Sequence, residues 1–176
     1  MDIQKVKVLL TKAEIEAKVK ELAQMLSRDY SGKNPLFVCV LKGAAVFLCD
    51  LIRHMDINLE VDFMAVSSYG NSTTSSGVVR ILKDLEYSIE DRHVIIVEDI
   101  IDTGLTLDYL RENLLSRRPA SLKIVALLDK PERRTVEIEA DYRGFCIPDE
   151  FVVGYGLDFK ENFRNLPDVC VLLEFG

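Results

Sequence analysis

Apolar residues recur along the chain with two different spacings, which predict helices and strands in alternation. From Ile15 to Leu26 they recur at helical spacing, and the Thr-Lys-Ala-Glu sequence that starts at Thr11 matches a capping box. Continuously apolar runs, such as 36–41 and 94–97, are typical of strands covered on both faces. The alternation favours an α/β fold with a mostly parallel central sheet flanked by helices, whose ligands bind beyond the carboxyl ends of the strands.

The same spacing sets approximate boundaries for each element. Helices are expected at about 11–30, 44–55 and 107–115. Strands are expected at 36–41, 59–65, 78–82, 94–97, 124–128, 142–146, 151–153 and 169–173. The polar segment from Ser67 to Gly77 separates two of these strands, and its small residues are typical of a disordered linker.

Length and composition restrict the chain to one folded domain, 1–176. Of its 176 residues, 48% are hydrophobic and 29% are charged, which suffices for an apolar core. The longest apolar stretches, 44–49 and 169–173, are far shorter than the ~20 residues of a membrane span. The N-terminal residues contain no apolar stretch of signal-peptide length. We therefore expect a cytoplasmic protein with no membrane partner.

The net charge of −7 disfavours binding to nucleic acid, which needs a cationic surface. Any polyanionic substrate must therefore meet a local cationic site. The basic pairs Arg117–Arg118 and Arg133–Arg134 are interpreted as solvated charge rather than as a nucleic-acid patch. The cysteines lack zinc-ligand spacing and are interpreted as free thiols of the core. They are Cys39, Cys49, Cys146 and Cys170.

The turn after the 94–97 strand carries three carboxylates within five residues, those of Glu98, Asp99 and Asp102. Because this turn enters a helix, its backbone N–H groups and the hydroxyl of Thr103 can cradle a phosphate. Acids at the end of the strand can accept hydrogen bonds from sugar hydroxyls, so the segment suits a phosphorylated ribose. From spacing alone, an acidic capped surface turn explains these residues about equally well.

The segment VIIVEDIIDTGLTL, residues 94–107, closely resembles the phosphoribosyl pyrophosphate signature of the type I phosphoribosyltransferases. Its variant is similar to that of the hypoxanthine (6-oxopurine) phosphoribosyltransferases, whose other motifs match in order at 41–43, 68–69, 127–130 and 151–158. The resemblance implies transfer of phosphoribose from phosphoribosyl pyrophosphate to N9 of hypoxanthine or guanine, with release of pyrophosphate. It also implies Mg²⁺ as cofactor and a homodimer or homotetramer.

The fold implied by this resemblance has a core at about 36–140. A small hood over the base is expected from the N-terminal segment and from about 141–176.

The resemblance implies roles for the signature residues. Asp102 corresponds to the catalytic residue that exchanges a proton with purine N7. The phosphoribose-binding residues are Glu98, Asp99, Asp102, Thr103, Gly104, Leu105 and Thr106. The residues expected at the metal are Asp158, Glu98 and Asp99.

The resemblance also implies contacts to pyrophosphate and to the base. The pyrophosphate-binding residues are Lys42, Gly43, Ser68, Tyr69 and Arg164, and the Leu41–Lys42 peptide bond is expected to be cis. The purine-binding residues are Lys130, Phe151, Val152 and Asp158. An ammonium group only donates hydrogen bonds, so Lys130 should prefer a 6-oxo group to the 6-amino group of adenine.

Two alternatives stay open. Phosphoribosyltransferases for adenine, uracil or orotate share the signature but lack the Lys130 and Phe151 arrangement. A regulatory protein of the same fold could sense phosphoribosyl pyrophosphate, but it should carry a DNA-binding module or a basic face, and neither is apparent here.

Overall fold

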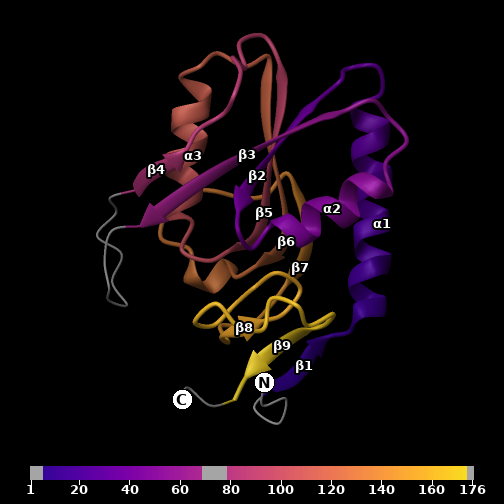
Figure 1. The fold of residues 1–176 in the computed structure, drawn as a ribbon, viewed down its shortest axis with the longest axis vertical. Helices are drawn as coiled ribbons and strands as arrows, with labels where there is room; N and C mark the ends of the chain where they lie inside the picture. Colours follow the sequence, from indigo (N-terminus) through magenta and orange to yellow (C-terminus); the bar gives the residue numbers. More distant parts are fainter. Residues whose placement is uncertain (1–5, 69–78, 174–176) are drawn as a thin grey trace.

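Strands β2 and β5 lie side by side at the centre of a mostly parallel sheet (Figure 1). The computed structural model describes residues 6–68 and 79–173, and in this part of the chain the main sheet has the order β4-β3-β2-β5-β6-β7. The strands are β2 Leu36–Leu41, β3 Glu60–Ser68, β4 Val79–Lys83, β5 His93–Ile101, β6 Ser121–Asp129 and β7 Tyr142–Cys146. Of these strands, only β4 is antiparallel to its neighbour. The predicted fold class is confirmed.

Helices cover both faces of the main sheet (Figure 1). They are α1 Lys12–Asp29, α2 Ala45–Arg53 and α3 Leu105–Leu115. Side chains alternate along β5, so Ile95 and Val97 pack into the core with α1 and α2, whereas Val94 and Ile96 pack into the core with α3. All four are fully buried. Cover on both faces explains why this strand is a continuous apolar run in the sequence.

The N-terminus of α1 confirms the predicted capping box. The backbone N–H of Glu14 donates to the Thr11 hydroxyl at 3.3 Å, and the backbone N–H of Thr11 donates to the Glu14 carboxylate at 2.8 Å. These two bonds satisfy donors that a helix start otherwise leaves unpaired. The helix therefore begins where the local sequence predicts it.

Residues near both ends of the chain meet in a second, smaller sheet. Its order is β1-β9-β8, with β1 at Val6–Leu10, β8 at Val152–Val153 and β9 at Val169–Leu172. It lies beyond the carboxyl ends of the main strands, at the bottom of Figure 1, where a small hood is expected. β1 was not predicted as a strand, because its pairing partner β9 is at the other end of the chain and no local pattern reveals it.

Two strands of the main sheet differ from the prediction. β7 was expected in the hood, but it pairs in parallel with β6 as an edge of the main sheet. β5 was expected to end at Val97, but its pairing with β6 continues to Ile101. Glu98 and Asp99, which were expected at the carboxyl end of the strand, therefore lie within it.

The interpretation of all cysteines as core thiols is wrong for two of them. Cys39 and Cys170 are buried, whereas Cys49 and Cys146 are exposed. Cys49 lies on α2 away from the core, and Cys146 ends the edge strand β7.

No helix in the described ranges is both long enough and apolar enough to cross a membrane.

Candidate active site

A cleft of about 280 Å³ opens between the carboxyl ends of the central strands and the small sheet. Lys42 follows β2, Asp102 follows β5 and Lys130 follows β6. Because these strands are parallel, their carboxyl ends meet at one edge of the sheet and bring the three residues together. The cleft is lined by Lys42, Gly43, Asp99, Ile100, Asp102, Lys130, Phe151, Val152, Leu157, Asp158 and Arg164.

A smaller hollow of about 180 Å³ adjoins the cleft at the start of α3. Asp102 lines both spaces, whereas Thr103, Gly104 and Thr106 line only the hollow. Gly104 precedes the helix with φ of 86°, and a Cβ there would lie 2.6 Å from Cγ2 of Ile138. Glycine is therefore needed both for its conformation and for its size. The N–H groups at a helix start lack intrahelical partners, so the hollow suits an anion such as a phosphate.

Glu98 and Asp99 are carboxylates without a cationic ion-pair partner in the described part of the chain. Glu98 lines the hollow and is 8% exposed, while Asp99 lines the cleft. Burial raises the pKa of Glu98 well above its ordinary value, and the charge of Asp99 raises it further. Burial also raises the pKa of Asp99 to about 6, although the N–H of Ile100 donates to its carboxylate at 2.7 Å. Such a pair favours protons, cations or hydrogen-bond donors as neighbours.

The raised pKa of Asp99 predicts that the contribution of this residue to the stability of the unliganded protein falls as the pH rises. Between the ordinary value of 3.8 and about 6, the folded state holds a proton that the unfolded state releases. The contribution of Asp99 to stability should therefore fall through this window and stay lower above it, whereas a carboxylate with a lowered pKa, such as Asp84, contributes in the opposite direction. Thermal melts of wild type and Asp99→Asn should nearly coincide at about pH 4.5, and the variant should melt several degrees higher at about pH 7.5.

The matched control for this prediction is Asp84→Asn. Arg117 binds the Asp84 carboxylate at 2.8 and 2.9 Å and lowers its pKa. This variant should lose stability at neutral pH instead of gaining it. The same difference in melting temperature between wild type and Asp99→Asn at every pH would contradict the prediction.

The two cations expected at pyrophosphate are paired with acidic residues. Lys42 Nζ lies 2.9 Å from the carboxylate of Glu161, and Arg164 Nη2 lies 2.8 Å from that of Asp158. Arg164 also donates to the carbonyl of Gly156 at 2.8 Å. The Leu41–Lys42 peptide bond is cis, as expected. An incoming polyphosphate would have to compete with these carboxylates for the two cations.

Gly43 lies against the Asp99 carboxylate, because a Cβ at Gly43 would overlap Asp99 Oδ2. We expect Gly43→Ala to displace this carboxylate and to raise about tenfold the KM for phosphoribosyl pyrophosphate, the substrate that the sequence resemblance implies. Stability should change little, because the displaced group is the end of a side chain. Steady-state kinetics with Gly32→Ala as control tests this, since nothing lies within 4 Å of a Cβ at Gly32, although its φ of 74° adds backbone strain. An unchanged KM in Gly43→Ala would contradict the prediction.

Asp102 is half-exposed and lies between the cleft and the hollow. Arg133 Nε donates to its Oδ1 at 2.8 Å. Arg134 donates to its backbone carbonyl. A carboxylate in this position can reach a ligand in the cleft while the adjoining hollow holds a phosphate.

The end of the cleft near Lys130 and Phe151 combines one buried ammonium group with apolar walls. Lys130 is 6% exposed, and no carboxylate forms an ion pair with it in the described ranges. Phe151 projects from the segment before β8 and contacts the ring of Phe159 edge to face, with centroids 5.7 Å apart. Ile100, Val152 and Leu157 complete the walls. An aromatic base with a carbonyl acceptor fits such a space.

A family model described as "Phosphoribosyl transferase domain" matches residues 5–160. The chain belongs to the phosphoribosyltransferase family.

Curated and solved relatives refine this assignment. The hypoxanthine-guanine phosphoribosyltransferase of Streptococcus thermophilus (strain CNRZ 1066) is 57% identical over 168 residues, which cover 96% of this chain and 93% of that protein. That of Lactococcus lactis subsp. lactis (strain IL1403) is 57% identical over 166 residues, 94% of this chain and 90% of that protein. A crystal structure of a hypoxanthine phosphoribosyltransferase from Staphylococcus aureus superposes with a TM-score of 0.93 at 52% identity, covering 96% of this chain and 92% of that one.

Not every residue predicted for the site of this phosphoribosyltransferase lies in its two spaces. Tyr69 lies outside the described residues, as does most of the Ser67–Gly77 segment, and the side chain of Ser68 is not described. Leu105 begins α3 but lines neither the cleft nor the hollow.

The sequence prediction missed several residues that line or contact the cleft. Ile100 and Leu157 are part of its walls, and Glu161 binds Lys42. Arg133 was interpreted as solvated charge, yet it binds Asp102. Leu157 and Glu161 could have been suspected from their positions near Asp158 and Arg164. No local feature of the sequence indicated a role for Arg133, because its partner Asp102 follows a different strand.

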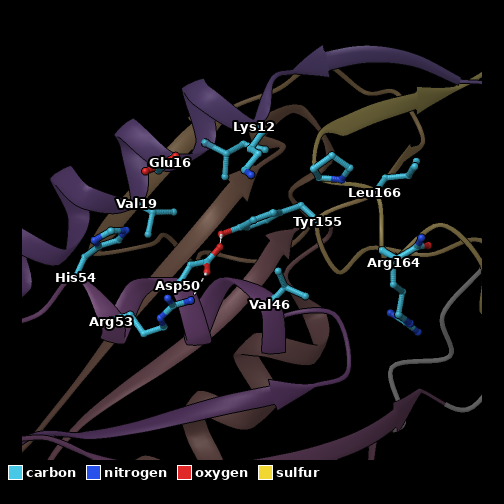
Figure 2. A pocket seen from close by; sticks show the side chains of 13 residues that line it. Lys12, Glu16, Val19, Val46, Asp50, Arg53, His54, Tyr155, Arg164 and Leu166 are labelled. Atoms are coloured by element: carbon cyan, nitrogen blue, oxygen red, sulfur yellow. Dashed lines mark hydrogen bonds and ion pairs between the residues drawn. The ribbon is translucent and has the colours of Figure 1, made fainter.

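A larger hollow of about 650 Å³ lies between α1, α2 and the segment before β9 (Figure 2). The hydroxyl of Tyr155 donates to the Asp50 carboxylate at 2.7 Å and joins that segment to α2. Arg164 lines this hollow as well as the cleft, and in Figure 2 its guanidinium points away from the Tyr155–Asp50 pair. This hollow and the cleft therefore share Arg164, whereas Asp99, Asp102 and Lys130 line only the cleft of the two.

Proposed function

We propose that this phosphoribosyltransferase acts in purine salvage, transferring phosphoribose from phosphoribosyl pyrophosphate to N9 of hypoxanthine or guanine. The observation that carries the proposal is the convergence of three groups in adjoining spaces. These are the anion site at the start of α3, the acids of β5, which form no ion pair within the described residues, and the buried ammonium of Lys130. The first suits the 5′-phosphate, the second the ribose and the third a 6-oxopurine.

In the reaction, the bond between C1′ and N9 forms while the bond between C1′ and pyrophosphate breaks. Asp102 accepts the proton that the purine loses at N7 as its electrons shift toward N9. Glu98 and Asp99 accept hydrogen bonds from the ribose hydroxyls and place negative charge near C1′, where positive charge develops. Thr103, Gly104, Leu105 and Thr106 bind the 5′-phosphate, Leu105 through its backbone.

The base is selected by the groups at the far end of the cleft. Lys130 donates to the purine O6, which adenine lacks. Phe151 stacks on the base, and backbone groups of Val152 and Asp158 bind its edge.

The leaving group meets the cations at the end of β2 and before β9. Lys42 and Arg164 bind pyrophosphate in place of their present acidic partners, and the backbone of Gly43 approaches it closely. Ser68 and Tyr69 are proposed to close over it and to exclude water.

The acidic residues of the site fit Mg²⁺. No group of three or more potential metal ligands occurs within the described ranges, and Mg²⁺ commonly binds through one or two carboxylates, several waters and substrate phosphates. We assign Asp158, Glu98 and Asp99 to the metal-bound substrate. When bound, Mg²⁺ supplies positive charge that stabilises the departing pyrophosphate.

Nucleotide formation measured with hypoxanthine, guanine, xanthine and adenine in parallel, with phosphoribosyl pyrophosphate and Mg²⁺, tests this proposal. We expect turnover of 6-oxopurines and none of adenine. Preference for adenine or a pyrimidine would assign another base to the enzyme. Absence of turnover despite binding of phosphoribosyl pyrophosphate would favour a regulatory protein.

We also propose that the enzyme is a cytoplasmic homodimer or homotetramer. All four cysteines are free thiols, which fits a reducing compartment. The oligomeric state rests on the resemblance to the family, and sedimentation equilibrium tests it.

A further inference from the structure

The segment that follows β6 lies along the turn that carries Asp102. It begins with the short 3₁₀ turn Pro131–Arg133 and continues through residues 134–138. The backbone N–H of Thr135 donates to the carbonyl of Thr103 at 3.0 Å. Two apolar side chains of the segment, those of Val136 and Ile138, pack against Gly104. Backbone and side-chain contacts therefore join this segment to the whole of turn 102–104.

Arg134 connects the segment to the ends of β5 and β6. It is 13% exposed, and its guanidinium donates both to the carbonyl of Asp102 and to the carboxylate of Asp129. Asp129 is 3% exposed and also binds Arg143 at 3.2 Å. The backbone N–H of Lys130 then donates to the carbonyl of Ile101 at 2.9 Å. This network fixes the end of β6 to the end of β5 next to the cleft, which Asp102 and Lys130 line.

Arg133 contacts the Asp102 side chain itself. Its Nε donates to Asp102 Oδ1 at 2.8 Å, and its Nη1 lies 3.6 Å from a carboxylate oxygen of Asp149. No hydrogen bond to Asp102 Oδ2 occurs within the part of the chain that the structure describes. One oxygen of the carboxylate is thus held, and the other is left for a ligand.

We propose that Arg133 and Arg134 are positioning residues for Asp102, Arg134 by fixing its backbone and Arg133 by orienting its carboxylate. The inference rests on the proposed function of Asp102 as the proton acceptor at N7. A half-exposed aspartate on a turn otherwise samples several rotamers, and a proton acceptor acts efficiently only when held within hydrogen-bond reach. Arg133 restricts these rotamers, and Asp149 keeps the guanidinium in place.

The test is a double-mutant cycle in Arg133→Met and Asp102→Asn. Arg133→Met should lower kcat for hypoxanthine about tenfold, with an unchanged KM for phosphoribosyl pyrophosphate and an unchanged melting temperature. Arg133→Lys should restore part of the loss. In the Asp102→Asn background, Arg133→Met should have almost no further effect, because its action passes through Asp102.

The matched control is Arg28→Met, since Arg28 Nε binds Asp29 at 2.9 Å on the surface of α1 and lines neither the cleft nor the hollow. Turnover within twofold of wild type in Arg133→Met would overturn the inference. An undiminished effect in the Asp102→Asn background would also overturn it.

The proposed function is judged separately, by turnover of the wild-type enzyme. A crystal structure of Arg133→Met decides the positioning role independently of activity. We expect the Asp102 carboxylate to leave its present rotamer, and an unmoved, well-ordered carboxylate would overturn the inference.

Discussion

Asp102→Asn should lower kcat for hypoxanthine by about 10²- to 10³-fold. Asparagine has the shape of aspartate, but its amide cannot accept the proton that the purine loses at N7. The affinity for phosphoribosyl pyrophosphate should change little, because the anion site at the start of α3 is built from backbone groups and hydroxyls. Steady-state kinetics, together with calorimetric titration of phosphoribosyl pyrophosphate in the presence of Mg²⁺, measures both quantities.

Loss of folding should not explain this effect. The Asp102–Arg133 pair is half-exposed, with side chains 42% and 43% accessible, and such surface pairs contribute only about 0–1 kcal/mol. Asp84→Asn is the matched control, since Asp84 pairs with Arg117 outside the cleft. The control should keep wild-type turnover. Near-normal turnover in Asp102→Asn would remove Asp102 from the role of proton acceptor.

Lys130→Met should lower kcat/KM for hypoxanthine about 10²-fold, because a hydrogen bond from a charged group to the purine O6 is lost. Methionine retains the length and volume of the side chain. The fold should be as stable or slightly more stable, since the substitution removes a buried ammonium that has no ion-pair partner among the residues that the structure describes. Discrimination between hypoxanthine and adenine should narrow by the same factor.

Competition between the two bases, measured as the ratio of their kcat/KM values, tests the role of Lys130. Lys123→Met is the matched control, because Lys123 lies near the other end of β6 and binds Asp141 at 2.7 Å on the surface. It should behave as wild type. A change below about threefold in the ratio for Lys130→Met would contradict the assignment of Lys130 to O6.

The class of the fold was predictable from the sequence, but the pairing of its strands was not. Helix α1 begins at its predicted cap, and buried strands such as β2 are visible in the sequence as continuous apolar runs. β1 was missed and β7 was expected in the hood, because the burial of each depends on a strand far away in sequence. The end of β5 was misjudged because polar residues there continue a ladder with β6.

The site, too, was only partly predicted from the sequence. Motif residues from distant segments, such as Lys42, Lys130 and Phe151, lie around one cleft with Asp102. The ion pairs of these residues were not predicted. The pairs Lys42–Glu161 and Asp102–Arg133 join segments that lie far apart in the sequence and meet in the tertiary structure. Charged residues in loops look alike in a sequence, whether they are solvated or paired.

By itself, the sequence determined the elements, the fold class and the motifs of the phosphoribosyltransferase family, because local spacing and short motifs carry this information. Only the tertiary structure decided which carboxylates have no cationic partner, which cations are already paired and which residues hold Asp102. Burial and electrostatic pairing depend on distances between segments that are remote in sequence. The strength of an acid or a base in the cleft is therefore a property of the fold.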